Sequence, residues 1–357
     1  MGFKSINNVD LLYRPSWADR LSAVVASLPI PSSLTYSLAA ILLTAMFLFV
    51  QWWQGAYSQD GFFGWHIFIA LQPLVPLAAI HYLDAVAGLA LLRFRSSFNG
   101  DEQAFQQVSF RLTTTPSAGT LVASFIGVVS SILLFGFLQD LDTSFKFARL
   151  ATAFPSKAVY LIYILTAWFG FGAWIFHTIH QLRVIHEVYT AQSRVDPAYP
   201  EPLYALSTIT SRTALIILAN TYGWFGVNAA TEASAPTHLI SLIITNLFFL
   251  GLGLLIFIWP LWGAHRLLEQ AKGEALAKNA HYLNQAIGHI HRQIADANVG
   301  GIDSWEKALA GLQHEKTRLE RMATWPWSPG TLRNFLIALV VPIVVWFVQF
   351  GLERLLE

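Results

Sequence analysis

The segment AIHYLDAVAGLALL, residues 79–92, is an apolar run that contains one histidine and one aspartate. It ends a longer apolar stretch, residues 65–92, which exceeds the length of about 20 residues that a helix needs to cross a bilayer. Ionisable groups are costly in lipid and are functional candidates there by default. The stretch therefore predicts either one long, tilted membrane helix in which Asp84 is buried, or a chain that bends at Gln72, Pro73 and Pro76 and follows the interface.

The composition of the whole chain also indicates a membrane protein. Of its 357 residues, 55% are hydrophobic and 12% are charged, whereas soluble domains carry about 25% charged residues. A net charge of +1 without a basic block argues against a nucleic-acid partner. The absence of cysteine excludes disulfides and thiolate metal sites. We expect an all-α integral membrane protein, with the lipid bilayer as its surroundings.

Seven apolar segments are long enough, or nearly so, to cross the membrane. The predicted spans are 34–53, 65–92, 118–138, 157–178, 213–231, 238–262 and 334–352. Lysine and arginine concentrate in cytoplasmic loops, and 18 of the 22 fall in one alternate set of loops that includes the N-terminal segment. We therefore predict a cytoplasmic N-terminus, an exoplasmic C-terminus and a bacterial plasma-membrane location.

This pattern divides the chain into four parts: a cytoplasmic segment (1–33), a six-span domain (34–263), a cytoplasmic helical hairpin (264–326) and a final membrane helix (327–357). Two short amphipathic helices are predicted outside the spans, either on the inner membrane surface or packed on protein. Ser16 is the candidate N-cap of the first. Their apolar faces are Trp17, Leu21, Val24 and Leu28 in the first, and Phe105, Val108 and Leu112 in the second.

The hairpin is the largest element predicted outside the membrane. Apolar residues spaced three and four apart indicate one helix and a returning helix. Because two helices alone bury too little apolar surface to be stable, we expect the hairpin to pack on another cytoplasmic element or on a second subunit. The stripes are Leu268, Ala271, Ala275, Leu283, Ile287, Ile290 and Ile294 in the first helix, and Trp305, Leu309, Leu312 and Leu319 in the second.

Polar residues within the spans are the candidate site residues. His81 and Asp84 share one helix face, and their expected partners are Arg93 or Arg95. The alternative is an ion, proton or ligand role. The polar positions Asn220, Asn228, Asn246 and Gln349 are expected either to line water or to form hydrogen bonds between helices.

Histidines of the fourth predicted span suggest no metal or haem site. His177, His180 and His186 are expected to be solvated at the inner end of that span. Catalytic motifs for hydrolases, zinc proteases and nucleotide-binding enzymes are absent from the sequence, and its last span has no lysine for a retinal Schiff base. We predict no cofactor, no bound metal and no enzymatic activity.

Two segments resemble parts of uncharacterised bacterial multi-span membrane proteins: HYLDAVAGLALLRFR (81–95) and TWPWSPGTLRNFLIALVVPIVVWFVQFGLERLL (324–356). That resemblance implies no activity. The predicted topology, though not the sequence, is similar to that of insect odorant and gustatory receptors. In that family cytoplasmic helices assemble a tetramer and the last span lines a cation pore, so the similarity implies an architecture and transfers no residue.

These features lead to two interpretations. The first is an oligomeric channel or receptor-like channel of unknown ion and ligand, assembled through residues 264–326 with its last span near the symmetry axis. The alternative is a non-conducting scaffold or signalling protein whose hairpin docks a cytoplasmic protein partner. A membrane enzyme that uses the histidines is a third interpretation, disfavoured by the lack of catalytic motifs.

Overall fold

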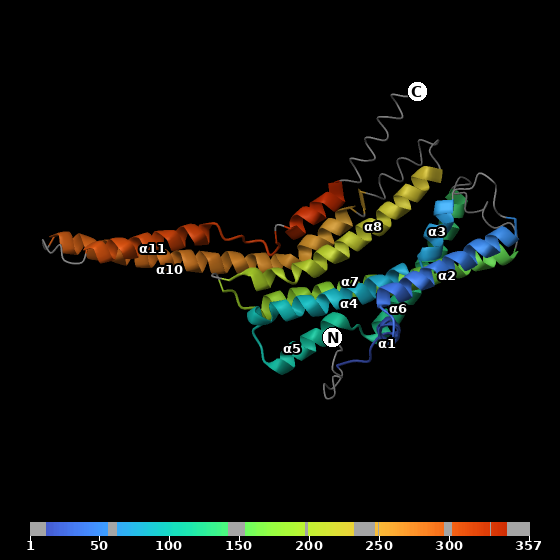
Figure 1. Ribbon diagram of the computed structural model, residues 1–357, viewed down its shortest axis with the longest axis horizontal. Coiled ribbons are helices and arrows are strands. Elements are labelled where there is room, and N and C mark those ends of the chain that lie inside the picture. The colour runs from blue at the N-terminus through green and yellow to red at the C-terminus, as the bar shows by residue number, and fades with distance from the viewer. Residues whose placement is uncertain are drawn as a thin grey trace, which may run out of the picture.

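The computed structural model describes residues 12–55, 63–141, 154–196, 199–231, 247–248, 250–295, 302–328 and 330–340. The described residues form helices joined by short connections, with no strand longer than an isolated bridge (Figure 1). The helices are α1 (Trp17–Ser27), α2 (Ser32–Trp53), α3 (Phe63–Leu71), α4 (Val75–Phe94), α5 (Glu102–Thr113), α6 (Ser117–Leu141), α7 (Phe154–Ala191), α8 (Ser207–Thr231), α10 (Trp262–Ala295) and α11 (Ile302–Glu320). Short 3-10 turns cover Arg95–Ser97, Glu201–Tyr204 and Trp259–Leu261.

Five helical runs within these ranges are long and apolar enough to cross a membrane, namely Ser32–Trp53, Val75–Ser97, Phe154–Ala191, Glu201–Trp224 and Leu250–Ala295. Shorter apolar helices cover Ser117–Leu133 and Gly330–Val340, within the predicted third span and at the start of the seventh. The all-helical class is thus confirmed, and several apolar helices are compatible with a membrane-embedded protein. The count of seven spans and the orientation of the termini stay predictions.

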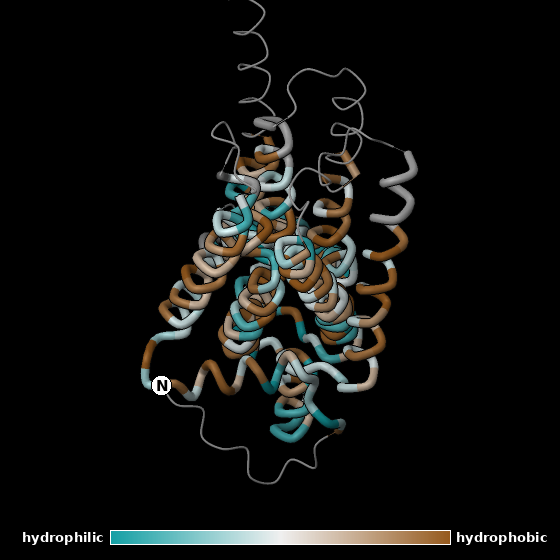
Figure 2. The backbone as a smooth tube through the Cα atoms, turned by 90° about the vertical axis from the view of Figure 1, so that its right-hand side faces the viewer, coloured by the Kyte–Doolittle hydropathy of each residue, from teal (hydrophilic) through white to brown (hydrophobic). Residues whose placement is uncertain are grey.

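Four of the helices, α2, α4, α6 and α7, lie side by side in an elongated bundle (Figure 1). Figure 2 shows hydrophobic stretches on several helices of the molecule. The closest approach joins α6 to α7. A Cβ atom on Gly172 would overlap the carbonyl oxygen of Ala123, and one on Gly127 would overlap that of Trp168. Glycine at these two positions therefore lets the two backbones touch, as small residues do between membrane helices.

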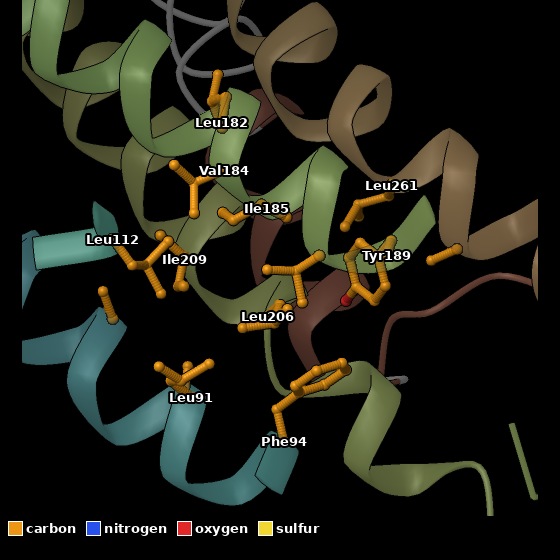
Figure 3. Close-up of a cluster of buried hydrophobic side chains, with 14 of the residues drawn as sticks. Leu91, Phe94, Leu112, Leu182, Val184, Ile185, Tyr189, Leu206, Ile209 and Leu261 are labelled. Carbon is orange, nitrogen blue, oxygen red and sulfur yellow. The ribbon is translucent and has the colours of Figure 1, made fainter. Parts of the chain in front are cut away.

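The main hydrophobic core lies where α4, α5, α7 and α8 meet the beginning of α10 (Figure 3). Tyr189 of α7 is fully buried there, and its hydroxyl donates a hydrogen bond to the carbonyl oxygen of Leu203 at 2.6 Å. The predicted apolar face of α5 contributes Phe105, Val108 and Leu112 to this core. Helix α5 thus packs on protein, which was one of the two placements left open by its sequence.

The predicted span 65–92 consists of two helices rather than one. Helix α3 ends at Leu71 and α4 begins at Val75, with Pro76 in its first turn. Pro73 lies in the connection, and proline has no backbone N–H to continue a helix. The break separates a short α3 from the long α4 that carries His81 and Asp84.

Helix α1 is attached to the bundle by its first turn. Ser16 is its N-cap, as predicted, and forms a capping box with Asp19. Ala18 is buried, and the indole N–H of Trp17 donates to Ser124 Oγ of α6 at 3.1 Å. The rest of the apolar stripe is exposed, which suits a helix that lies at a membrane interface; its members are Leu21, Val24 and Leu28.

Helices α10 and α11 run antiparallel as a hairpin that projects away from the bundle (Figure 1). The apolar stripe predicted for α10 is partly wrong. Leu268 is buried, but Ile287 and Ile294 are 40% and 62% exposed, and Asn279 with Ala286 takes the buried side instead. Asn279 faces α11 because its Nδ2 donates hydrogen bonds to the carbonyl oxygen of Leu312 at 3.1 Å and to Glu315 Oε2 at 3.0 Å.

Candidate functional site

An imidazole and a carboxylate meet inside the bundle. Nε2 of His177 on α7 lies 2.8 Å from Oδ1 of Asp84 on α4. The His177 side chain is 2% exposed and that of Asp84 is 18% exposed. Helices α4 and α7 pack alongside each other, so two side chains 93 positions apart in the sequence form one hydrogen-bonded pair.

The expected pairing of Asp84 with Arg93 or Arg95 is wrong. Arg93 is exposed, and Arg95 forms an ion pair with Glu102. The reason is axial distance. At 1.5 Å per residue, Arg93 lies about 14 Å further along α4 than Asp84, whereas α7 supplies a partner at the level of the carboxylate.

The expectation that His177 is solvated is also wrong. Helix α7 continues to Ala191, well beyond residue 178, where the span was predicted to end. His177 lies within this 38-residue helix and is buried against Asp84 of α4, so water does not solvate it. His180, one turn further along, is half-buried, with its Nε2 3.0 Å from the carbonyl oxygen of Arg111 and 3.2 Å from the hydroxyl of Tyr13.

The pair can hold one proton or two. With one, His177 donates from Nε2 to an ionised Asp84, and Nδ1 carries no hydrogen. A second proton can bind the other carboxylate oxygen of Asp84 or Nδ1 of His177, and Nδ1 is buried with no hydrogen-bond partner among the described groups. A buried donor without an acceptor is costly.

Asp19 lies within electrostatic range of both members of the pair. Its Oδ2 accepts hydrogen bonds from the backbone N–H and hydroxyl of Ser16, at 2.9 and 2.8 Å, and from those of Thr115, at 2.9 and 3.2 Å. These bonds join the first turn of α1 to the segment between α5 and α6. The carboxylate thus fixes α1 close to the Asp84–His177 pair.

Tyr13, just before α1, makes a second connection to the same region. Its hydroxyl donates to the carbonyl oxygen of Thr114 at 2.7 Å. Burial raises the pKa of Tyr13 from 10.0 to about 12, so the phenol keeps its proton to a more alkaline pH than a solvated tyrosine does. The contacts of Tyr13 with Thr114 and of Asp19 with Thr115 hold the start of α1 against the segment between α5 and α6.

His81 has a different partner from Asp84. Its Nδ1 lies 3.3 Å from the hydroxyl of Tyr36 on α2. The two α4 side chains that share a face in the sequence thus contact two different helices, α2 through His81 and α7 through Asp84. Together they tie α4 to both neighbours through polar contacts.

Of the other predicted site residues, the structure describes the side chain of Asn220 alone, and no contact joins it to the Asp84–His177 pair. Asn220 is half-buried on α8, and its nearest polar neighbour in the sequence, Thr221, donates its hydroxyl to Ile217 within the same helix. The side chain of Asn228, and the whole of Asn246 and Gln349, lie outside the described residues. The described part of the chain holds no group of three or more His, Cys, Asp or Glu side chains arranged for a metal ion.

Sequence reasoning missed Asp19 and Tyr36 and misplaced His177. One signal in the sequence could have found the pair. Two apolar helices each carry two polar residues one turn apart, His81 with Asp84 and His177 with His180. Because polar groups inside lipid need partners, these two helices could have been matched to each other. Comparison with protein-family models, curated proteins and solved structures gives no match to this chain. Its function must be inferred from its own geometry.

Proposed function

We propose that this chain is one subunit of an oligomeric membrane channel, assembled through the α10–α11 hairpin. One observation carries the proposal: residues Leu250–Ala295 form a 46-residue helical run that begins as an apolar span and continues as the first arm of the hairpin. A contact between the hairpins of two subunits would act on an arm that is joined to the apolar span by one 3-10 turn, Trp259–Leu261.

The surface of the hairpin favours a second copy of the chain as its partner. Ile287 and Ile294 lie two turns apart on the same side of α10 and are exposed. The hairpin projects from the bundle (Figure 1), so its own chain leaves these side chains uncovered in the described ranges. Exposed apolar side chains on an isolated two-helix element favour association, which adds the buried area that two helices lack.

In this proposal the Asp84–His177 pair controls the shape of each subunit rather than lining the pore. The two side chains contact each other between α4 and α7 of one chain, which favours a role within the subunit. The pore-lining role falls to the last span, as the predicted topology implies. We expect Asp84 to influence conduction indirectly, because its hydrogen bond with His177 fixes the packing of α4 against α7.

The mass of the purified protein in lipid nanodiscs tests this proposal. We compare the wild type with a double variant, Ile287→Glu with Ile294→Glu. A matched control, Lys278→Glu with Gln285→Glu, adds acids to exposed positions on the opposite face of α10. The proposal expects a closed oligomer that dissociates only in the isoleucine variant, and ion conductance from the wild type in planar bilayers.

Two results would overturn the proposal. A monomeric wild type would exclude a pore on a shared axis. An intact oligomer without conductance under any applied voltage would move the assignment to a non-conducting scaffold that uses the same hairpin surface.

A further inference from the structure

Helix α2 contacts the bundle through a very narrow face. Of its 22 residues only Phe47 and Gln51 are buried, one turn apart. On the other side Phe49, Trp52 and Trp53 are 58%, 67% and 68% exposed. The last turns of α2 thus expose aromatic side chains on the outer surface, while the amide of Gln51 is buried against the protein.

Gln51 is fully buried, and neither its Nε2 nor its Oε1 has a hydrogen-bond partner among the described groups. Ser156, in the first turn of α7, is also fully buried, and its Oγ has no partner there either. Each buried polar group without a partner costs free energy, most of all where water is excluded. A bound molecule that forms hydrogen bonds with both side chains would remove this cost.

The packing register brings these two side chains to the same level. The hydroxyl of Tyr163 on α7 donates to the carbonyl oxygen of Leu43 on α2 at 2.8 Å, and the rings of Phe47 and Tyr163 lie 5.1 Å apart. Phe47 and Tyr160 belong to one buried cluster. Because α2 and α7 run antiparallel, one turn beyond Phe47 reaches Gln51, and one turn before Tyr160 reaches Ser156.

We propose that Gln51 and Ser156 form a binding site for a small uncharged molecule that both donates and accepts hydrogen bonds. The amide offers two donors and one acceptor, and the hydroxyl offers one donor and one acceptor. Phe47, Tyr160 and the buried His66, whose ring centre lies 6.0 Å from that of Phe47, supply the surrounding surface. This site does not depend on the proposed channel function.

The chemistry of the site selects its guest. Both Gln51 and Ser156 are neutral, and Lys157, the charged residue next to Ser156, is exposed rather than buried with them. A neutral guest avoids the cost of placing an unpaired charge in an apolar bundle. A neutral donor–acceptor group is offered by a water molecule and by an organic amide or alcohol.

The test compares the full-length wild type with Gln51→Leu in lipid nanodiscs, using Ser156→Ala as a milder second variant. Gln106→Leu, at an exposed position of α5, is the control for the substitution itself. If a guest satisfies the amide, Gln51→Leu loses those hydrogen bonds, and we expect Tm to fall by about 2 to 4 °C relative to the control. If the amide truly lacks a partner, the same change raises Tm, because a buried unpaired amide is replaced by an apolar side chain of similar size.

Acetamide and hydroxyl-radical labelling distinguish the two sources of the guest. A rise in Tm with added acetamide in the wild type, absent from Gln51→Leu, supports an organic amide or alcohol. A lower Tm in Gln51→Leu without an acetamide effect, together with radical labelling of Phe47 or Tyr160 that disappears in the variant, supports bound water. An unchanged or higher Tm in both Gln51→Leu and Ser156→Ala would overturn the proposal.

Discussion

The Nε2 atom of His177 lies 2.8 Å from Oδ1 of Asp84, and this hydrogen bond joins α7 to α4 inside the bundle. With 2% and 18% of the two side chains exposed, water compensates little for the loss of either partner. A buried pair of this kind has a characteristic energetic signature: removal of one partner is much more harmful than the value of the pair itself suggests, because the other is left unpaired.

The first prediction is that His177→Ala destabilises the protein by about 3–5 kcal/mol, the range for breaking a buried pair from one side. The double variant Asp84→Ala with His177→Ala should lose less than the sum of the single losses, because neither leaves an isolated polar group. Reversible unfolding in bicelles measures all three. His281→Ala, at an exposed position on the hairpin, is the control. Additive losses would show that the two side chains are not coupled.

The features of the fold that could be predicted from the sequence are those set by local chemistry. The N-cap at Ser16 follows from a serine placed before an apolar stripe, and the apolar lengths mark the helices. The buried side of α10 could not be predicted. Asn279 is buried because its amide bonds Leu312 and Glu315, which lie 33 and 36 positions away on another helix.

The candidate site shows the same division. The type of residue was enough to single out Asp84, since a carboxylate inside an apolar span needs a partner. The identity of that partner depends on how α4 and α7 align laterally, and periodicity within one helix carries no information on this. His177 was misjudged for a related reason, because hydropathy alone does not show that α7 continues as a helix to Ala191.

The second prediction concerns the contact between α6 and α7. A methyl group at Gly172 would overlap the carbonyl oxygen of Ala123, and a backbone atom cannot rotate away as a side chain can. We expect Gly172→Ala to cost about 1–3 kcal/mol of stability, the usual range for overpacking. Gly251→Ala is the matched control, because nothing lies within 4 Å of a Cβ atom there. That variant should be neutral or more stable by up to about 1 kcal/mol, since alanine favours helix over glycine. Equal unfolding temperatures for the two variants would contradict the close approach.

The third prediction concerns the hairpin. Asn279 is 3% exposed and donates to both Leu312 and Glu315 of the opposite arm. Asn279→Ala leaves these acceptors without that donor, and we expect a loss of about 1–3 kcal/mol. Hydrogen–deuterium exchange should report it as faster exchange in α10 and α11, with the bundle helices unchanged. Asn284→Ala, at an exposed position on the same helix, should leave exchange as in the wild type. Faster exchange across the whole protein would mean that the hairpin and the bundle unfold together.

The fourth prediction is a pH dependence that arises from Tyr13. Burial raises its pKa from 10.0 to about 12, so the folded protein holds the phenolic proton more tightly than the unfolded chain. The stabilisation is therefore complete below pH 10 and is lost as the pH rises through about 12. Subtracting the tyrosinate absorbance titration of Tyr13→Phe from that of the wild type isolates one of the 11 tyrosines. We expect the difference curve to have its midpoint near 12, and the stability advantage of the wild type over Tyr13→Phe to shrink over the same interval. A midpoint near 10 would mean that the phenol is solvated and that the segment before α1 is not held at Thr114.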